Sequence, residues 1–268
     1  MKRFLSGIIL FPIVAIIVIF GNKYLIDFVV SMVALMSVYE FYRAFKVSKK
    51  ASPISWIGYL AAIMISIIHI IPNTLILKLI GAIIPISIFI LFLYVIITNL
   101  KVSIKDIAIT FFGICYIPLF LMFLSIIRNN LPNGNILVWF VFFSAWWTDI
   151  FAFLVGKKFG KHKFSKVSPN KSIEGCIGGT IGSVIMNMIL AIVCNYFWNL
   201  GINYIVIFFI CLLLSVIGQI GDLAASTIKR YTEVKDFSNL IPGHGGMLDR
   251  IDSVIFIAPF AYFLLMLI

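Results

Sequence analysis

The length of its apolar runs constrains this chain more than any other feature. Stretches almost free of charge are separated by short polar breaks, and they cover about residues 4–20, 25–42, 54–71, 76–98, 107–127, 136–156, 173–198, 204–228 and 251–268. A run of about 18 apolar residues, wound as a helix, crosses a hydrocarbon core of roughly 30 Å and satisfies its own backbone groups. The sequence therefore predicts an all-α, polytopic membrane protein with about nine transmembrane helices.

The composition excludes a soluble globular protein, because only 12% of the residues are charged and 62% are hydrophobic, against about 25% charged in soluble domains. A net charge of +11 would suit nucleic acid, but excess Lys and Arg in a membrane protein reports orientation first, so no nucleic-acid partner is expected. The four cysteines stand singly with no CxxC spacing, which is typical of small buried residues and not of disulfide or zinc frameworks.

The distribution of cations predicts the orientation. If successive spans alternate in direction, all of the 21 Lys and Arg residues except Lys23, Lys78 and Arg128 fall on one side of the membrane. The N-terminus is therefore expected in the cytoplasm and the C-terminus on the opposite side. The short breaks favour antiparallel neighbours in a single integral membrane domain, 1–268. We expect N-terminal helices in 1–128, catalytic helices in 135–268 with cytoplasmic loops 156–172 and 229–250, and a bacterial inner membrane as the location.

Asp149 and Asp222 are acids that lie inside predicted spans. Asp149 follows Trp146-Trp147-Thr148 in the span 136–156, and Asp222 lies in the span 204–228. Both are about seven residues, or roughly 10 Å, from the cytoplasmic end of their span. An ionised group at that depth is costly unless paired, so an intramembrane acid indicates a functional site.

The span 204–228 carries a polar face that leads toward this end. Ser215, Gln219, Asp222, Ser226 and Lys229 follow one another at spacings of three and four residues, which places them on one side of a helix. We expect this side to face a polar cleft. Hydrogen bonding between helices is the alternative, and it suits Ser215 and Gln219 well.

A stripe of glycines opens the span 173–198, at positions 175, 178, 179 and 182. Overlapping GxxxG pairs favour close backbone packing. The partner is either another helix of this chain or a second subunit, so a homodimer is one expectation.

The loop before that span is basic, with six lysines between Gly156 and Glu174. A solvated loop beside anionic lipid headgroups explains most of them. Lys171 differs, because it follows Ser168-Pro169-Asn170 immediately before a helix, and a helix N-terminus favours phosphate.

The stretch from Ser226 to Asp252, STIKRYTEVKDFSNLIPGHGGMLDRID, concentrates the remaining chemistry. Asp249 and Asp252 are three residues apart at the start of the last span, so both point from one face. Carboxylate oxygens suit Mg²⁺, which fills its other positions with phosphate oxygens and water, and Asp222 can complete such a set. A structural ion-pair network with Lys229, Arg230 and Arg250 is the competing interpretation.

The turn Pro242-Gly243-His244-Gly245-Gly246 lacks Cβ atoms at its three glycines, so backbone N–H groups can approach an anion closely. Cations flank it on both sides, which predicts a phosphate cradle. His244 is either a phosphate contact or proton carrier, or part of the loop structure.

These residues resemble the complete signature of the phosphatidate cytidylyltransferases, the CDP-diacylglycerol synthases. The resemblance extends over essentially the whole chain, with mild departures at Phe153, often Tyr, and Ser172, often Thr. It rests on Ser226, Ile228-Lys229-Arg230, Lys235-Asp236, Ser238, Ile241-Pro242, His244-Gly245-Gly246-Met247 and Asp249-Arg250-Ile251-Asp252.

The resemblance implies transfer of CMP from CTP to phosphatidic acid in phospholipid biosynthesis, with Mg²⁺ or Mn²⁺, at the cytoplasmic side of the cell membrane. By position and by analogy, Asp222 and Asp249 are metal ligands assisted by Asp252. The phosphate-binding cations are then Lys229, Arg230, Lys235 and Arg250. The substrate cleft is completed by Ser226, Lys171, Asp149, His244, Gly245 and Gly246.

Two other functions are alternatives. A CTP-dependent kinase of a membrane lipid alcohol has similar needs, although it requires a base for its hydroxyl nucleophile. A secondary transporter also uses intramembrane acids, but the chain has no visible repeat and its polar residues gather at one side of the membrane.

Overall fold

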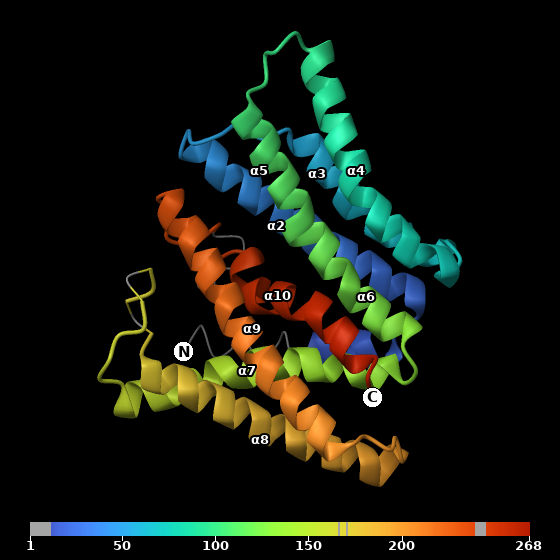
Figure 1. Ribbon diagram of the computed structural model, residues 1–268, viewed down its shortest axis with the longest axis vertical. Helices are drawn as coiled ribbons and strands as arrows, with labels where there is room; N and C mark the ends of the chain where they lie inside the picture. The colour runs from blue at the N-terminus through green and yellow to red at the C-terminus, as the bar shows by residue number, and fades with distance from the viewer. Residues whose placement is uncertain (1–11, 166, 170, 239–244) are drawn as a thin grey trace. The chain divides into compact units, whose positions relative to one another are not determined.

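The structure of the chain is a computed structural model that describes residues 12–165, 167–169, 171–238 and 245–268. In these residues the regular structure is helical, apart from one isolated antiparallel bridge between Lys163 and Ser172. This confirms the all-α class. The helices (Figure 1) are α2 (Lys23–Val47), α3 (Ser55–Met64), η1 (Ile65–Ile70), α4 (Asn73–Ile97), α5 (Ile104–Ile114), η2 (Cys115–Leu119), α6 (Phe120–Asn130), α7 (Gly134–Phe159), α8 (Ile173–Trp198), α9 (Tyr204–Tyr231) and α10 (Leu248–Leu265).

The polytopic membrane class is also confirmed. In the described part of the chain, six helical stretches are long and apolar enough to cross a membrane: Lys23–Val47, Thr74–Ile97, Ile104–Asn130, Gly134–Phe159, Ile173–Trp198 and Tyr204–Tyr231. The remaining predicted spans correspond to the shorter pair α3 and η1, to α10, and to the run 4–20, of which only 12–20 lies in the described residues and is helical. The count of nine and the orientation stay predictions.

Polar caps explain several helix boundaries. The side chain of Asn22 accepts a hydrogen bond from Leu25 N at 2.8 Å, and Ser172 Oγ accepts one from Gly175 N at 3.1 Å. Each satisfies an N–H group that the first helical turn leaves without a partner. At its other end α8 stops at Asn199, which takes a left-handed conformation with φ of 52°. The predicted range 173–198 is therefore the observed helix.

Two predicted spans are less regular than an unbroken α-helix. The run 54–71 forms α3 followed by the 3₁₀ helix η1, and the run 107–127 contains the π-helical turn η2 around Pro118. Proline lacks the N–H group of an α-helical hydrogen bond, which favours such a local change of winding.

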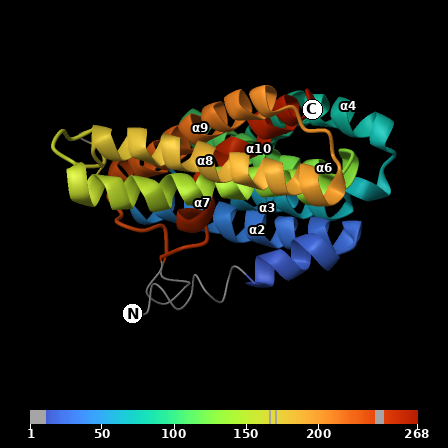
Figure 2. The same ribbon diagram turned by 90° about the horizontal axis from the view of Figure 1, so that it is seen from below.

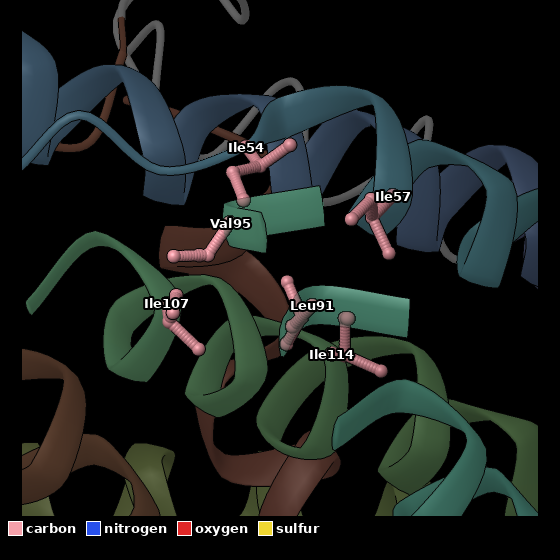
Figure 3. Packing of buried hydrophobic residues seen from close by; sticks show 6 residues of the cluster. All are labelled: Ile54, Ile57, Leu91, Val95, Ile107 and Ile114. Carbon is pink, nitrogen blue, oxygen red and sulfur yellow. The ribbon is translucent and has the colours of Figure 1, made fainter. Parts of the chain in front are cut away.

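The chain divides into two compact units, and the first comprises Met1–Ser125 with Tyr231–Arg250. Part of its core is a cluster of aliphatic side chains from the start of α3, from α4 and from α5, which point toward one another in Figure 3. The cluster consists of Ile54, Ile57, Leu91, Val95, Ile107 and Ile114. The unit also contains the described signature residues 231–238 and 245–250, which fold with the N-terminal helices.

The second unit comprises Ile126–Arg230 with Ile251–Ile268. Within it α7 and α8 lie side by side in both views (Figures 1 and 2). The glycine stripe makes this possible: a Cβ atom on Gly179 would lie 2.8 Å from the carbonyl oxygen of Thr148, and one on Gly178 would lie 2.6 Å from the side chain of Val155. The partner of the stripe is thus a helix of the same chain, and the homodimer stays a prediction.

Candidate functional site

The polar face of α9 packs against other helices of the second unit. Ser215 Oγ lies 2.7 Å from Thr148 Oγ1 of α7, and Gln219 Nε2 donates to Thr180 Oγ1 of α8 at 2.8 Å. These contacts confirm that the face turns inward. They also show that Ser215 and Gln219 join helices by hydrogen bonds, which was the alternative interpretation for both.

Asp222 is the next polar residue along this face, and its carboxylate forms an ion pair with the ammonium group of Lys171. Lys171 lies two residues before α8, which begins at Ile173, while Asp222 lies inside α9. The two side chains are 25% and 22% exposed, so they are partly withdrawn from solvent yet accessible. The structure therefore brings together two residues that the sequence analysis assigned to one cleft.

Backbone hydrogen bonds hold Lys171 in this place. Its carbonyl oxygen accepts from Phe164 N at 2.9 Å, and its own N–H donates to Ser168 O at 3.1 Å. Glu174, in the first turn of α8, lies 2.6 Å from His162 Nδ1 and so fastens the preceding loop to the helix. The loop is thus ordered around the lysine.

Arg230, the last residue of α9 in this unit, contacts the same loop. Its Nε donates to the carbonyl oxygen of Val167 at 3.4 Å. Two predicted site residues of α9 therefore contact the segment before α8 within one unit, Asp222 at Lys171 and Arg230 at Val167.

The other predicted residues of the second unit lie on three helices. Ser226 and Lys229 are partly buried on α9, and Asp149 is exposed on α7. Asp252 is buried on α10, where its carboxylate accepts a hydrogen bond from Ser253 N at 2.7 Å. A Cβ atom on Gly221 would lie 2.9 Å from the carbonyl oxygen of Asp252, so α10 at Asp252 packs against α9 immediately beside Asp222.

The remaining predicted residues belong to the first unit. Asp249 Oδ2 accepts hydrogen bonds from Phe237 N at 2.9 Å and from Gly246 N at 3.0 Å. Gly245 has a φ of +77°, a conformation that L residues rarely adopt. The N–H of Gly246 and the space beside Gly245 are therefore used by the Asp249 carboxylate.

Lys235 and Arg250 are exposed in this unit. His244 lies outside the described residues, together with Pro242 and Gly243.

The donor chemistry fits a hard divalent cation, since the three predicted ligands offer only carboxylate oxygens. No group of three or more His, Cys, Asp or Glu side chains that could hold a metal ion occurs among residues 12–165, 167–169, 171–238 and 245–268. The assignment of Asp222, Asp249 and Asp252 as ligands stays a prediction.

Sequence reasoning overlooked two acids of α2, although the rule that flagged Asp149 and Asp222 applies to both. Asp27 and Glu40 are buried and both lie within the predicted span 25–42. Asp27 lies 2.8 Å from His69 Nδ1 and accepts a hydrogen bond from Ser125 Oγ, which makes a satisfied buried cluster. Glu40 instead contacts the signature segment.

Comparison with known proteins decides the family. The sequence model of the cytidylyltransferase family matches residues 1–268 of the chain. The chain belongs to this family. A phosphatidate cytidylyltransferase of Bacillus subtilis (strain 168) is 44% identical to the chain over 142 residues. The alignment covers 53% of this chain and 51% of the Bacillus protein.

Staphylococcal proteins of the same name align over a longer stretch. Those of Staphylococcus haemolyticus (strain JCSC1435) and Staphylococcus aureus (strain COL) are 35% and 37% identical over 178 residues, which are 66% of each chain. These alignments thus span between about half and two thirds of the relatives' length.

Proposed function

We propose that this member of the cytidylyltransferase family transfers CMP from CTP to phosphatidic acid, giving CDP-diacylglycerol and pyrophosphate. The names of its relatives support this reaction. The observation that carries it is the ion pair between Lys171 and Asp222. The pair joins a cation and a carboxylate from two separate segments of the chain, and both side chains are partly accessible. The sequence analysis assigned each of them to a cleft that binds phosphate.

The reaction requires little acid–base chemistry. An oxygen of the phosphatidate phosphate attacks the α-phosphorus of CTP and forms a new P–O bond. The bond from that phosphorus to the oxygen bridging to the β-phosphate breaks, and its electron pair leaves with pyrophosphate. Because the nucleophile is already an anion, the main obstacle is the repulsion between two polyanions, which fixed positive charges lower.

The cations of the chain are suited to this task. Lys171 lies before α8 and Arg230 contacts the same segment at Val167, and both would bind phosphate oxygens together with Lys229. Lys235 and Arg250 are exposed and would serve the same purpose. The cleft would be completed by Ser226, Asp149, His244, Gly245 and Gly246.

Asp222, Asp249 and Asp252 would hold Mg²⁺ or Mn²⁺. When bound, the ion would neutralise phosphate charge during the transfer. The close packing of Gly221 on the backbone of Asp252 supports a common role for Asp222 and Asp252, since it brings their two helices together at that level.

We further propose that the reaction takes place at the cytoplasmic side of the membrane. The excess of Lys and Arg on the predicted inner side supports this orientation. Asp222 is about two and a half turns from the end of α9 at Tyr231. At that depth, cytosolic CTP and the headgroup of an inner-leaflet lipid can both reach it.

The experiment is pyrophosphate release by the purified protein in detergent with CTP and Mg²⁺, with and without phosphatidic acid. ATP in place of CTP and a polyprenol in place of phosphatidic acid are the controls. Release that needs both CTP and phosphatidate supports the proposal. Formation of CDP with the polyprenol, without release of pyrophosphate with phosphatidate, would contradict it and favour a lipid-alcohol kinase.

A further inference from the structure

Glu40 of α2 is a buried acid that binds the signature segment of the first unit. It is only 1% exposed. Its carboxylate accepts hydrogen bonds from Ser238 Oγ at 2.6 Å, from Met247 N at 2.9 Å and from Leu248 N at 2.8 Å. A residue of an N-terminal helix thus contacts residues about 200 positions further along the chain.

The three hydrogen bonds explain how this acid can be buried. A carboxylate withdrawn from water is costly unless donors surround it. Two of its donors are backbone N–H groups at the start of α10, which begins at Leu248. Such groups have no partner within their own helix, and the helix dipole favours an anion beside them. Glu40 therefore caps α10 from a distant part of the sequence.

Gly246 provides an independent observation of the same fit. A Cβ atom at this position would lie 2.3 Å from Glu40 Oε2 and 2.6 Å from Glu40 Cδ. Contacts below 3.0 Å require something to shift. The glycine therefore lets the Glu40 carboxylate approach the backbone of the segment closely.

Glu40 and Asp249 bind neighbouring residues of the same segment. Glu40 binds Ser238, Met247 and Leu248, while Asp249 binds the adjoining N–H groups of Phe237 and Gly246. The two carboxylates thereby hold both ends of the stretch 237–248, one from α2 and one from α10.

We propose that Glu40 is a positioning residue for CMP transfer, which fixes the start of α10 and so the orientation of Asp249. This inference rests on the proposed function of the site. It adds a residue of the N-terminal helices to the site, since Glu40 would act on the reaction through the start of α10 and Asp249, without touching the substrate.

The test compares Glu40→Gln with Asp27→Asn. Both changes neutralise a buried acid of α2 while nearly preserving its shape, but the described contacts of Asp27 are with His69 and Ser125. Glutamine has one acceptor oxygen and directs its NH₂ group toward donors. We expect Glu40→Gln to lower kcat per folded protein on the order of 10- to 100-fold and to raise the Mg²⁺ concentration needed for half-maximal rate.

Hydrogen exchange provides a readout that does not depend on activity. In Glu40→Gln the amides of Met247 and Leu248 should exchange faster than in the wild type, while in Asp27→Asn they should exchange at the wild-type rate. Unchanged exchange of both amides in Glu40→Gln would overturn the proposal. So would a loss of activity that merely follows the loss of folded protein in both variants.

A double variant tests the contact with Gly246. Gly246→Ala alone should lower the rate of CMP transfer. In a Glu40→Ala background the added methyl group no longer meets a carboxylate. The combined loss should therefore be smaller than the product of the two single losses. Losses that multiply would contradict the contact.

The two proposals can fail separately. If the wild-type protein released no pyrophosphate with CTP, Mg²⁺ and phosphatidate, the proposed function would fail. In that case faster exchange of Met247 and Leu248 in Glu40→Gln would still establish that Glu40 fixes the start of α10, and unchanged exchange would refute it.

Discussion

Lys171 and Asp222 form an ion pair that joins the start of α8 to the C-terminal part of α9. The pair is partly exposed, so its contribution to stability lies between those of a surface pair and a buried pair. If its role is chemical, activity and stability should respond differently to its removal.

Lys171→Met should lower CMP transfer about 100-fold, because it removes a cation from the phosphate site. It should also lower the free energy of unfolding by about 1–3 kcal/mol, because Asp222 loses its ion-pair partner. The double variant Lys171→Met with Asp222→Leu should recover much of the stability and none of the activity. Rates of pyrophosphate release and thermal melting in detergent measure the two effects. Recovery of activity in the double variant would mean that the pair is only structural.

Lys163→Ala is the matched control for this loop. Lys163 forms its bridge to Ser172 through the backbone, which alanine preserves, and it is exposed. We expect wild-type turnover within about twofold, as for surface changes away from a site. A severe loss would place the phosphate site elsewhere on the loop.

Asp249→Asn should abolish most activity while the fold persists. Asparagine keeps one side-chain oxygen, so the N–H groups of Phe237 and Gly246 retain an acceptor in place of Asp249 Oδ2. The negative charge that a metal ligand requires is lost, and turnover should fall by about 100-fold or more. Glu233→Gln, which changes an exposed acid of the same unit outside the signature residues, is the control. Wild-type turnover in Asp249→Asn would refute its assignment as a ligand.

Local signals in the sequence were sufficient for much of the fold. The range 173–198 was predicted correctly, because an apolar run is bounded there by the cap Ser172 and by Asn199 in a left-handed conformation. The inward face of α9 was predicted as well, since helical periodicity alone places Ser215 and Gln219 on one side. The 3₁₀ winding of η1 was not predicted, because no proline or glycine marks it in its sequence ISIIHI.

Long-range contacts set the limit of prediction at the site. The depth of Asp222 in its span indicated that it needed a partner, and the position of Lys171 before a helix singled out that lysine. The ion pair between them was not predicted, because the sequence analysis paired Asp222 with a metal or with Lys229, Arg230 and Arg250. Glu40 could not be matched to Ser238 either, because 198 residues separate them. No local pattern specifies which buried acid meets which donor when the partners come together only in the folded chain.

The contact between α7 and α8 should be sensitive to a single methyl group. Gly179→Ala would place a Cβ atom 2.8 Å from the carbonyl oxygen of Thr148. Backbone cannot yield as a flexible side chain can, so we expect a loss of about 1–3 kcal/mol in the free energy of unfolding. Gly81→Ala, in α4, is the matched control, since a Cβ atom there meets nothing within 4 Å. Equal melting temperatures for the two variants would contradict the close packing of the stripe.

The pair between Lys50 and Glu233 should give the first unit a small, pH-dependent contribution to stability. Lys50 Nζ lies 2.9 Å from Glu233 Oε1. This hydrogen bond, and then the attraction of opposite charges, lowers the pKa of Glu233 and raises the pKa of Lys50. A lowered carboxyl pKa stabilises the fold above its unfolded value of about 4.3, and that stabilisation is lost as the pH falls through the folded value. A raised lysine pKa acts oppositely, so its contribution is present below about 10.4 and lost as the pH rises through the folded value.

We therefore expect the difference in melting temperature between the wild type and Glu233→Gln to be constant from about pH 5 to pH 10 and to shrink on both sides. Both side chains are largely accessible, at 36% and 73% exposed, so solvent and salt screen the pair and the difference should fall further in high salt. Thermal melting of both proteins in detergent across this range measures it. A difference that does not shrink below about pH 4 would contradict this prediction, because protonation of the Glu233 carboxyl would then leave its contribution to stability unchanged.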